Sequence, residues 1–146
     1  MVKVLFVCHG NICRSVMAQF VFQDMVDKAG LSDQFYVDSC ATSNEEIGND
    51  MYPPARRKLQ AEGVPFVRHS ARRITSSDYE RFDYIIAMEE YNLRNIARII
   101  PSDPSGKIRL LLDRDIADPW YTGNFDRTYS DLVMGCSSLL DELSGT

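Results

Sequence analysis

The N-terminal part of the chain places the strongest constraint on its fold, because an apolar run leads directly into a turn with reactive side chains. Residues 2–7 are hydrophobic apart from Lys3, which is typical of a buried β-strand. Cys8 to Ser15 includes glycine and asparagine, and a helical pattern follows. A strand, a tight turn and a helix in this order direct several backbone N–H groups at one point. The sequence therefore predicts a loop that binds a phosphate-like anion.

Individual positions of this loop suit the expected geometry. Gly10 can take a positive φ without a Cβ clash, and Asn11 tolerates the left-handed region, so the chain can curl tightly. The planar guanidinium of Arg14 can donate to two phosphate oxygens at once. The Ser15 hydroxyl can either cap the first helical turn or donate to the sulfur of Cys8. The predicted loop consists of His9, Gly10, Asn11, Ile12, Cys13, Arg14 and Ser15.

Cys8 is the candidate nucleophile. The inward N–H groups, the helix dipole and Arg14 all favour negative charge, so we expect a thiolate at neutral pH. The alternative is that Cys8 is a small buried hydrophobic residue, as lone cysteines often are. The pairing with Arg14 and the strand, turn and helix around it favour the nucleophile.

A thiolate that displaces a poor leaving group from a phosphate ester needs an acid to protonate the leaving oxygen, and such an acid contributes ~10²–10⁴-fold in rate. Candidate carboxylates lie in residues 112–121. Asp118 is the first choice, because Pro119 biases the preceding residue toward an extended backbone and so fixes the direction of its carboxyl group. Asp115 is the second choice. An Asp-Pro pair by itself would as readily start a turn, and it is the phosphate loop that favours catalysis.

The two motifs together resemble those of the low-molecular-weight protein tyrosine phosphatases. That family has a C-x-G-N-x-C-R-S loop near the N-terminus and an Asp-Pro acid loop near the C-terminus, and the resemblance covers nearly the whole chain. It implies that Cys8 is the nucleophile, Arg14 the phosphate clamp and Asp118 the general acid and base. The implied reaction is hydrolysis of phosphotyrosine in a protein substrate through a cysteinyl-phosphate, with phosphate or a similar oxyanion in the active site and no metal or cofactor.

The resemblance also implies roles for residues outside the two motifs. A hydrogen-bond network that holds the loop is expected from Asn11, Ser15, Ser39 and His69. The wall of the cleft is expected from His9, Glu45, Glu46, Trp120 and Tyr121. The acidic residues of this wall should repel acidic residues that flank a phosphotyrosine. Three positions depart from the residues that are common in the family, and none of them is expected to touch the chemistry: Val16, Ala41 and Glu89.

Other functions fit the sequence less well. Arsenate reductases share the loop and fold but relay oxidation to further cysteines, and none occurs between Cys40 and Cys136. A phosphocarrier protein also has a cysteine loop after its first strand, yet it needs neither Arg14 nor Asp118. An inactive phosphotyrosine-binding module would have lost the nucleophile or the acid. Phosphoarginine remains an alternative substrate, because a few bacterial relatives act on it.

Composition limits the class of protein further. With 146 residues, of which 45% are hydrophobic, the chain suits one domain over residues 1–146. A net charge of -5 argues against binding to nucleic acid or to an acidic membrane, and no apolar run is long enough to span a bilayer. A catalytic thiol requires a reducing compartment, so the expected location is the cytoplasm. Cys13 is either a redox partner for Cys8 through a reversible disulfide or a small packing residue.

Short apolar runs alternate with helical periodicity, which predicts a single three-layer α/β domain. Its four-stranded parallel sheet should have helices on both faces and the phosphate loop after the first strand. The expected strands are Val2–Val7, Phe35–Val37, Tyr84–Ala87 and Ile108–Leu111. The expected helices cover residues 17–29, 55–61, 89–99 and 125–143. The long connections 41–54 and 113–124 should line the cleft.

Overall fold

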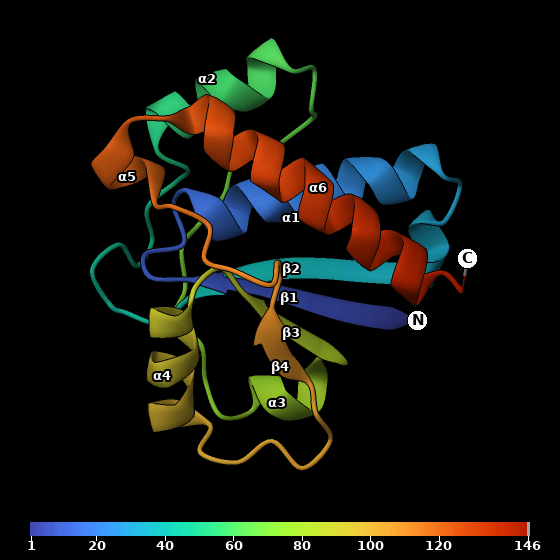
Figure 1. Cartoon of the computed structure of the whole chain (residues 1–146), viewed down its shortest axis with the longest axis vertical. Helices are drawn as coiled ribbons and strands as arrows, with labels where there is room; N and C mark the ends of the chain where they lie inside the picture. The colour runs from blue at the N-terminus through green and yellow to red at the C-terminus, as the bar shows by residue number, and fades with distance from the viewer. Residues whose placement is uncertain (146) are drawn as a thin grey trace.

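A parallel sheet forms the middle layer of the structure, a computed structural model that describes residues 1–145 (Figure 1). The sheet has four strands in the order β2-β1-β3-β4, which confirms the predicted parallel topology. Their bounds are β1 (Val2–Cys8), β2 (Phe35–Ala41), β3 (Tyr84–Ala87) and β4 (Ile108–Leu110). Because β1 is central and pairs with both β2 and β3, the loop that follows it starts at the carboxyl end of the sheet, between its neighbouring strands.

Helices cover both faces of the sheet, as predicted (Figure 1). One face carries α1 (Arg14–Lys28), α2 (Pro53–Ala61) and α6 (Phe125–Leu143). The other face carries α3 (Asp78–Arg81) and α4 (Glu90–Ile99). Two short elements complete the fold, the 3-10 turn η1 (Ser32–Gln34) and the single helical turn α5 (Pro119–Thr122).

Alternate side chains of β1 enter two separate hydrophobic cores. Val4 and Phe6 pack with α1 and α6, whereas Leu5 and Val7 pack with β3, α3 and α4, and all four are fully buried. A strand that is covered on both faces needs apolar residues at every position, which explains the continuous apolar run at the N-terminus.

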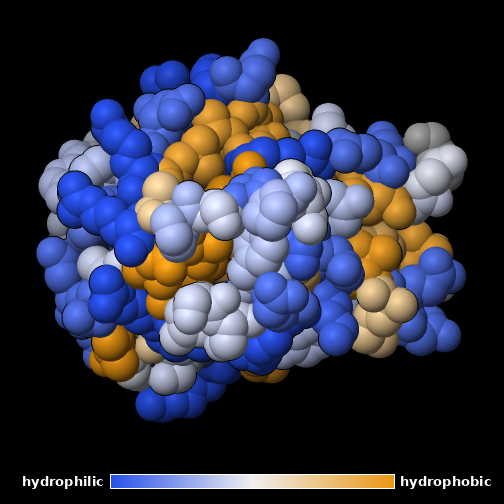
Figure 2. All heavy atoms as spheres, turned by 90° about the horizontal axis from the view of Figure 1, so that it is seen from below, coloured by the Kyte–Doolittle hydropathy of each residue, from blue (hydrophilic) through white to orange (hydrophobic). Residues whose placement is uncertain are grey.

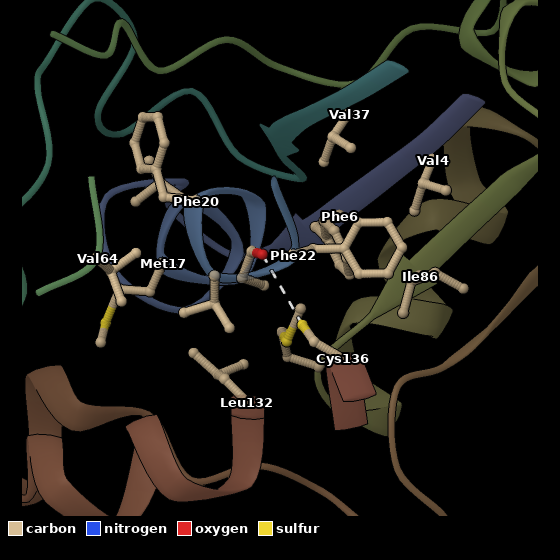
Figure 3. Close-up of a cluster of buried hydrophobic side chains, with 14 of the residues drawn as sticks. Val4, Phe6, Met17, Phe20, Phe22, Val37, Val64, Ile86, Leu132 and Cys136 are labelled. Carbon is tan, nitrogen blue, oxygen red and sulfur yellow. Dashed lines mark hydrogen bonds between the residues drawn. The ribbon is translucent and has the colours of Figure 1, made fainter. Parts of the chain in front are cut away.

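The larger core fixes the two ends of the phosphate loop. Phe6 of β1 meets Phe22 of α1 edge to face, with 5.7 Å between ring centroids (Figure 3). Cys136 of α6 lies against α1, and its thiol donates to the carbonyl of Ala18 at 3.8 Å. Fully burying a side chain such as Phe22 contributes roughly 1.5–3 kcal/mol. The strand before the loop and the helix after it are therefore held as one packed unit.

Several boundaries differ from the sequence prediction. β2 extends to Ala41, because Asp38 and Ser39 continue the pairing with β1 although their polarity does not suggest a buried strand. β4 ends at Leu110, one residue earlier than expected. α3, η1 and α5 were not predicted, and each is at most four residues long, which is too short for a periodic pattern.

The face that carries α3 and α4 shows mainly hydrophilic residues, with hydrophobic patches between them (Figure 2). Within residues 1–145, no helix combines the length and the apolar character needed to cross a membrane.

Candidate active site

The loop between β1 and α1 curls through a single left-handed residue. Asn11 has a φ of 61°, and it is the only residue other than glycine with a positive φ among those described. Of the two residues that could take a positive φ, Asn11 does so and Gly10 does not. A Cβ on Gly10 would lie 3.4 Å from Cγ of Glu46, so the glycine leaves room for the connection between β2 and α2 to approach the loop.

Cys8 is the last residue of β1, and its side chain is almost completely buried. The backbone N–H of Asn11 donates to its sulfur at 3.3 Å. The Ser15 hydroxyl lies 3.0 Å from the same sulfur. Ser15 therefore does not cap α1, whose N-cap residue is Cys13 and has no side-chain cap bond. Of the two roles predicted for Ser15, the structure shows the contact with sulfur and not the helix cap.

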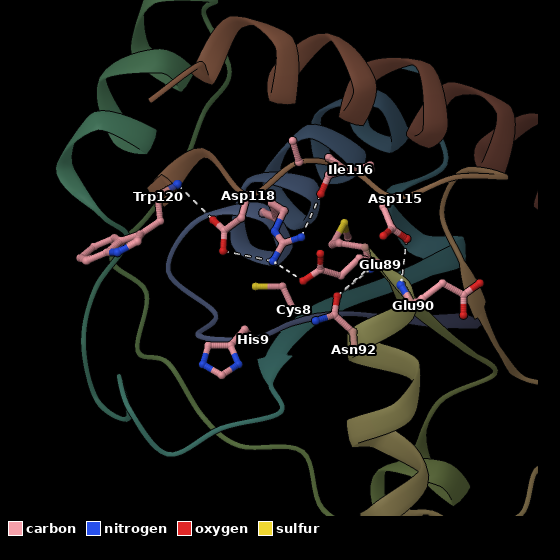
Figure 4. A network of polar contacts seen from close by, with 12 residues as sticks. Cys8, His9, Glu89, Glu90, Asn92, Asp115, Ile116, Asp118 and Trp120 are labelled. Atoms are coloured by element: carbon pink, nitrogen blue, oxygen red, sulfur yellow. Dashed lines mark hydrogen bonds and ion pairs between the residues drawn. The ribbon is translucent and has the colours of Figure 1, made fainter. Parts of the chain in front are cut away.

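Arg14 is the first residue of α1, and its side chain is 1% exposed. Nη1 donates to the carbonyl of Ile116 at 2.9 Å, and Nη2 donates to Glu89 at 3.2 Å and to Asp118 at 3.3 Å (Figure 4). Burial disfavours the cation, but Cys8, Asp118 and Glu89 outweigh burial and raise the pKa of Arg14. Nε is buried and has no partner among the described residues. The guanidinium is therefore held in place, and its Nε–H remains available to donate to a bound ligand.

Glu89 is a residue of the site that the sequence did not predict. The expectation that it would not touch the chemistry is wrong, because its carboxylate pairs with Arg14. The same carboxylate caps α4, while the Asn92 side chain accepts from the backbone N–H of Glu89 at 3.1 Å. The capping pattern of Glu89 and Asn92 indicates the start of a helix and not a contact with Arg14, so no sequence signal identified Glu89 as a residue of the site.

The structure separates the two candidate acids. Oδ2 of Asp118 faces Arg14, and Oδ1 accepts from the backbone N–H of Trp120 at 3.0 Å, so Asp118 caps the short helix α5. Asp118 lines the pocket, whereas Asp115 does not and accepts instead from the backbone N–H of Glu90 at 2.9 Å (Figure 4). Only Asp118 is therefore placed to meet a group bound over Cys8.

The four predicted supporting residues meet behind the loop. Nδ2 of Asn11 donates to Ser15 at 2.8 Å and to Ser39 at 3.0 Å. His69 Nε2 lies 2.8 Å from the backbone oxygen of Asn11, and burial lowers the pKa of this imidazole. A neutral His69 can donate a hydrogen bond to the backbone oxygen of Asn11 and so stabilise the left-handed conformation of that residue. Gln19, which the sequence did not suggest, accepts from Ser39 at 2.6 Å.

A pocket of about 120 Å³ opens over the phosphate loop. The five residues expected in the cleft wall all line it: His9, Glu45, Glu46, Trp120 and Tyr121. His9 Nε2 lies 2.7 Å from the Glu45 carboxylate, which ties the loop to the connection 42–52. Trp120 and Tyr121 are 50% and 83% exposed, so aromatic surface is available at the mouth.

Cys13 also lines the pocket, and it is a free thiol like the other cysteines described. Burial, and then the nearby Cys8, raise the pKa of Cys13. Cys13 is therefore a protonated thiol at neutral pH. Among residues 1–145, no cluster of three or more His, Cys, Asp or Glu side chains could hold a metal ion.

A thiol under directed N–H groups, with a buried arginine and a carboxylate beside it, can bind a phosphate ester and attack its phosphorus. The fold and the site thus fit one class of protein, the phosphatases with a cysteine-containing phosphate loop. Comparison with known proteins identifies the family. Residues 3–146 match the family described as low molecular weight phosphotyrosine protein phosphatase, and the chain belongs to it.

Individual relatives agree with this assignment. A low molecular weight phosphotyrosine protein phosphatase of Schizosaccharomyces pombe is 41% identical over 142 residues, which cover 90% of each chain. The crystal structure of YfkJ from Bacillus subtilis is 36% identical, with a TM-score of 0.96 over 99% of this chain and 96% of that chain. The crystal structure of the Drosophila arginine phosphatase DARP is 32% identical, with a TM-score of 0.85 over 97% of each chain.

Proposed function

We propose that this enzyme hydrolyses phosphotyrosine in protein substrates, with Cys8 as nucleophile, Arg14 as phosphate clamp and Asp118 as general acid and base. The observation that supports this most directly is the convergence on one pocket of the Cys8 sulfur, the Arg14 guanidinium and the Asp118 carboxyl group. The buried arginine balances the charge that phosphate and thiolate bring together.

In the first step the thiolate attacks phosphorus, and the bond between phosphorus and the tyrosine oxygen breaks. Asp118 gives its proton to that oxygen, and a cysteinyl-phosphate forms. Arg14 and the N–H groups of the loop stabilise the charge on the equatorial oxygens.

In the second step Asp118 takes a proton from water, and the resulting hydroxide attacks phosphorus. The bond between sulfur and phosphorus breaks, which restores the thiolate and releases inorganic phosphate. Ser15, which contacts the sulfur at 3.0 Å, stabilises Cys8 as the leaving group of this step.

The accompanying expectations follow from the same chemistry. The whole chain acts as one phosphatase domain, with neither nucleic acid nor membrane as a partner, in a reducing compartment such as the cytoplasm. For Cys13 we propose a redox role, in which peroxide oxidises Cys8 to a sulfenic acid and the Cys13 thiol condenses with it, releasing water and forming a reversible disulfide.

Phosphoarginine is the alternative substrate, supported by the similarity to the Drosophila arginine phosphatase. Turnover of matched phosphotyrosine, phosphoserine and phosphoarginine peptides separates the two, with Cys8→Ser as the inactive control. We expect the phosphotyrosine peptide to be hydrolysed fastest. Faster turnover of phosphoarginine would overturn the substrate assignment, and equal activity in Cys8→Ser would overturn the mechanism.

A further inference from the structure

We propose that Tyr52 is a positioning residue that holds the acid loop, residues 113–124, against the phosphate loop. Its ring lies 4.6 Å from the ring of Trp120, measured between centroids, and 6.2 Å from that of Phe125. It also packs on the buried cluster that contains Ile12 and Cys13. One side chain thus contacts both loops of the site. The inference rests on the proposed role of Asp118 as acid.

The acid loop depends on such a contact. α5 has only four residues, and a helix of one turn is unstable without tertiary support. Trp120 belongs to this turn, and its backbone N–H donates to the carboxylate of Asp118 at 3.0 Å (Figure 4). A displacement of Trp120 therefore displaces the Asp118 carboxyl group as well. On the other side, Thr128 of α6 donates to the carbonyl of Ala117 at 3.1 Å, which fixes the start of the turn but not its aromatic end.

Tyr52 is itself anchored independently of the acid loop. Its backbone N–H donates to the carbonyl of Ile12 at 2.9 Å. Pro53, the first residue of α2, restricts Tyr52 to an extended backbone, with a φ of -54° and a ψ of 132°. The ring is therefore fixed relative to the phosphate loop, and the contact between Tyr52 and Trp120 acts together with the pair between Arg14 and Asp118 to position the Asp118 carboxyl group over that loop.

Loss of the ring should affect proton transfer more than binding of phosphate. An acid displaced by about 1 Å can lose up to ~10²-fold in rate. For Tyr52→Leu we expect kcat/KM to fall about tenfold on an aryl phosphate with a poor leaving group, which corresponds to about 1.4 kcal/mol. A substrate with an activated leaving group needs little help from the acid when the cysteinyl-phosphate forms, so its kcat/KM should change much less.

Trp120 is the single tryptophan of the chain, which provides a second readout that does not depend on activity. Its side chain is half exposed and half covered, so removal of the covering ring should shift its fluorescence emission to longer wavelength. Tyr52→Leu keeps an apolar side chain of moderate size and the backbone bond to Ile12. Tyr52→Phe keeps the ring and serves as the matched control.

The test measures kcat and KM of the wild type and of both variants on phenyl phosphate and on p-nitrophenyl phosphate, together with the emission spectrum of Trp120. We expect Tyr52→Leu to show the selective loss on phenyl phosphate and the shifted emission, and Tyr52→Phe to match the wild type. An equal loss on both substrates, or an unchanged spectrum in Tyr52→Leu, would overturn the inference. If the wild type hydrolysed neither ester, the proposed function itself would fail, whereas the emission spectra would still decide whether Tyr52 holds Trp120.

Discussion

Replacement of Asp118 tests the acid and its structural role separately, because its two carboxylate oxygens have different partners. Oδ2 faces Arg14 and is the oxygen nearer the phosphate site, whereas Oδ1 caps α5 through the N–H of Trp120. Asp118→Asn keeps an acceptor for the cap but has no acidic proton, and Asp118→Ala loses both. Proton donation contributes ~10²–10⁴-fold in rate, or about 2.7–5.4 kcal/mol of transition-state stabilisation. The cap contributes about 1 kcal/mol to stability.

Both variants should therefore lose ~10²–10⁴-fold in kcat/KM on phenyl phosphate and much less on p-nitrophenyl phosphate. Steady-state kinetics measures this difference, and urea denaturation measures stability. Asp118→Ala should be less stable than Asp118→Asn by about 1 kcal/mol, because only Asn retains the cap. The reasoning is refuted if Asp118→Asn retains the wild-type kcat/KM on phenyl phosphate, or if kcat/KM falls by the same factor on both esters.

Three further perturbations test other parts of the site. Burial lowers the pKa of His69 below its ordinary 6.5, so the unfolded state binds a proton more readily than the folded state does. The contribution of His69 to the free energy of unfolding should therefore be fully present above about pH 6.5 and should be lost as the pH decreases. Across this pH range the urea midpoint of His69→Gln should vary much less than that of the wild type. An identical pH dependence of the two midpoints would contradict this role of His69. Glu89→Gln removes one of the two carboxylates that pair with the buried Arg14, which should lower the free energy of unfolding. The loss should be limited to about 1–2 kcal/mol, because Asp118 still pairs with the guanidinium. An unchanged urea midpoint would show that the pair between Glu89 and Arg14 is energetically neutral. Mass spectrometry after mild peroxide treatment should find a disulfide between Cys8 and Cys13 in the wild type and Cys8 sulfinic acid in Cys13→Ser, and sulfinic acid alone in the wild type would exclude the redox role.

Much of the fold follows from local patterns in the sequence. The apolar run before Cys8 requires a strand covered on both faces, and the structure places β1 in that position. β3 has the predicted bounds, Tyr84–Ala87, because it is short, apolar and buried. The predicted end of β2 was wrong, since polar Asp38 and Ser39 pair with β1 although their side chains do not resemble those of a buried strand.

The placement of Glu89 depended on the order of the strands. β3 lies next to β1, so the residue just beyond the carboxyl end of β3 comes beside the start of α1. Glu89 and Arg14 are 75 residues apart in sequence, and their ion pair exists only because of this neighbourhood. A pattern of single residues does not state which strands are adjacent, so the pair could not be predicted.

What the sequence determined by itself is the set of reactive groups in the phosphate loop, because Cys8, Arg14 and the turn residues lie within eight consecutive positions. Tertiary structure alone decided how distant groups meet that loop. It placed Asp118, the first choice from the sequence, in the pocket, and it brought Glu89 to Arg14 and Tyr52 to Trp120. Such contacts depend on how strands and helices pack together, and packing is a property of the whole chain rather than of any segment.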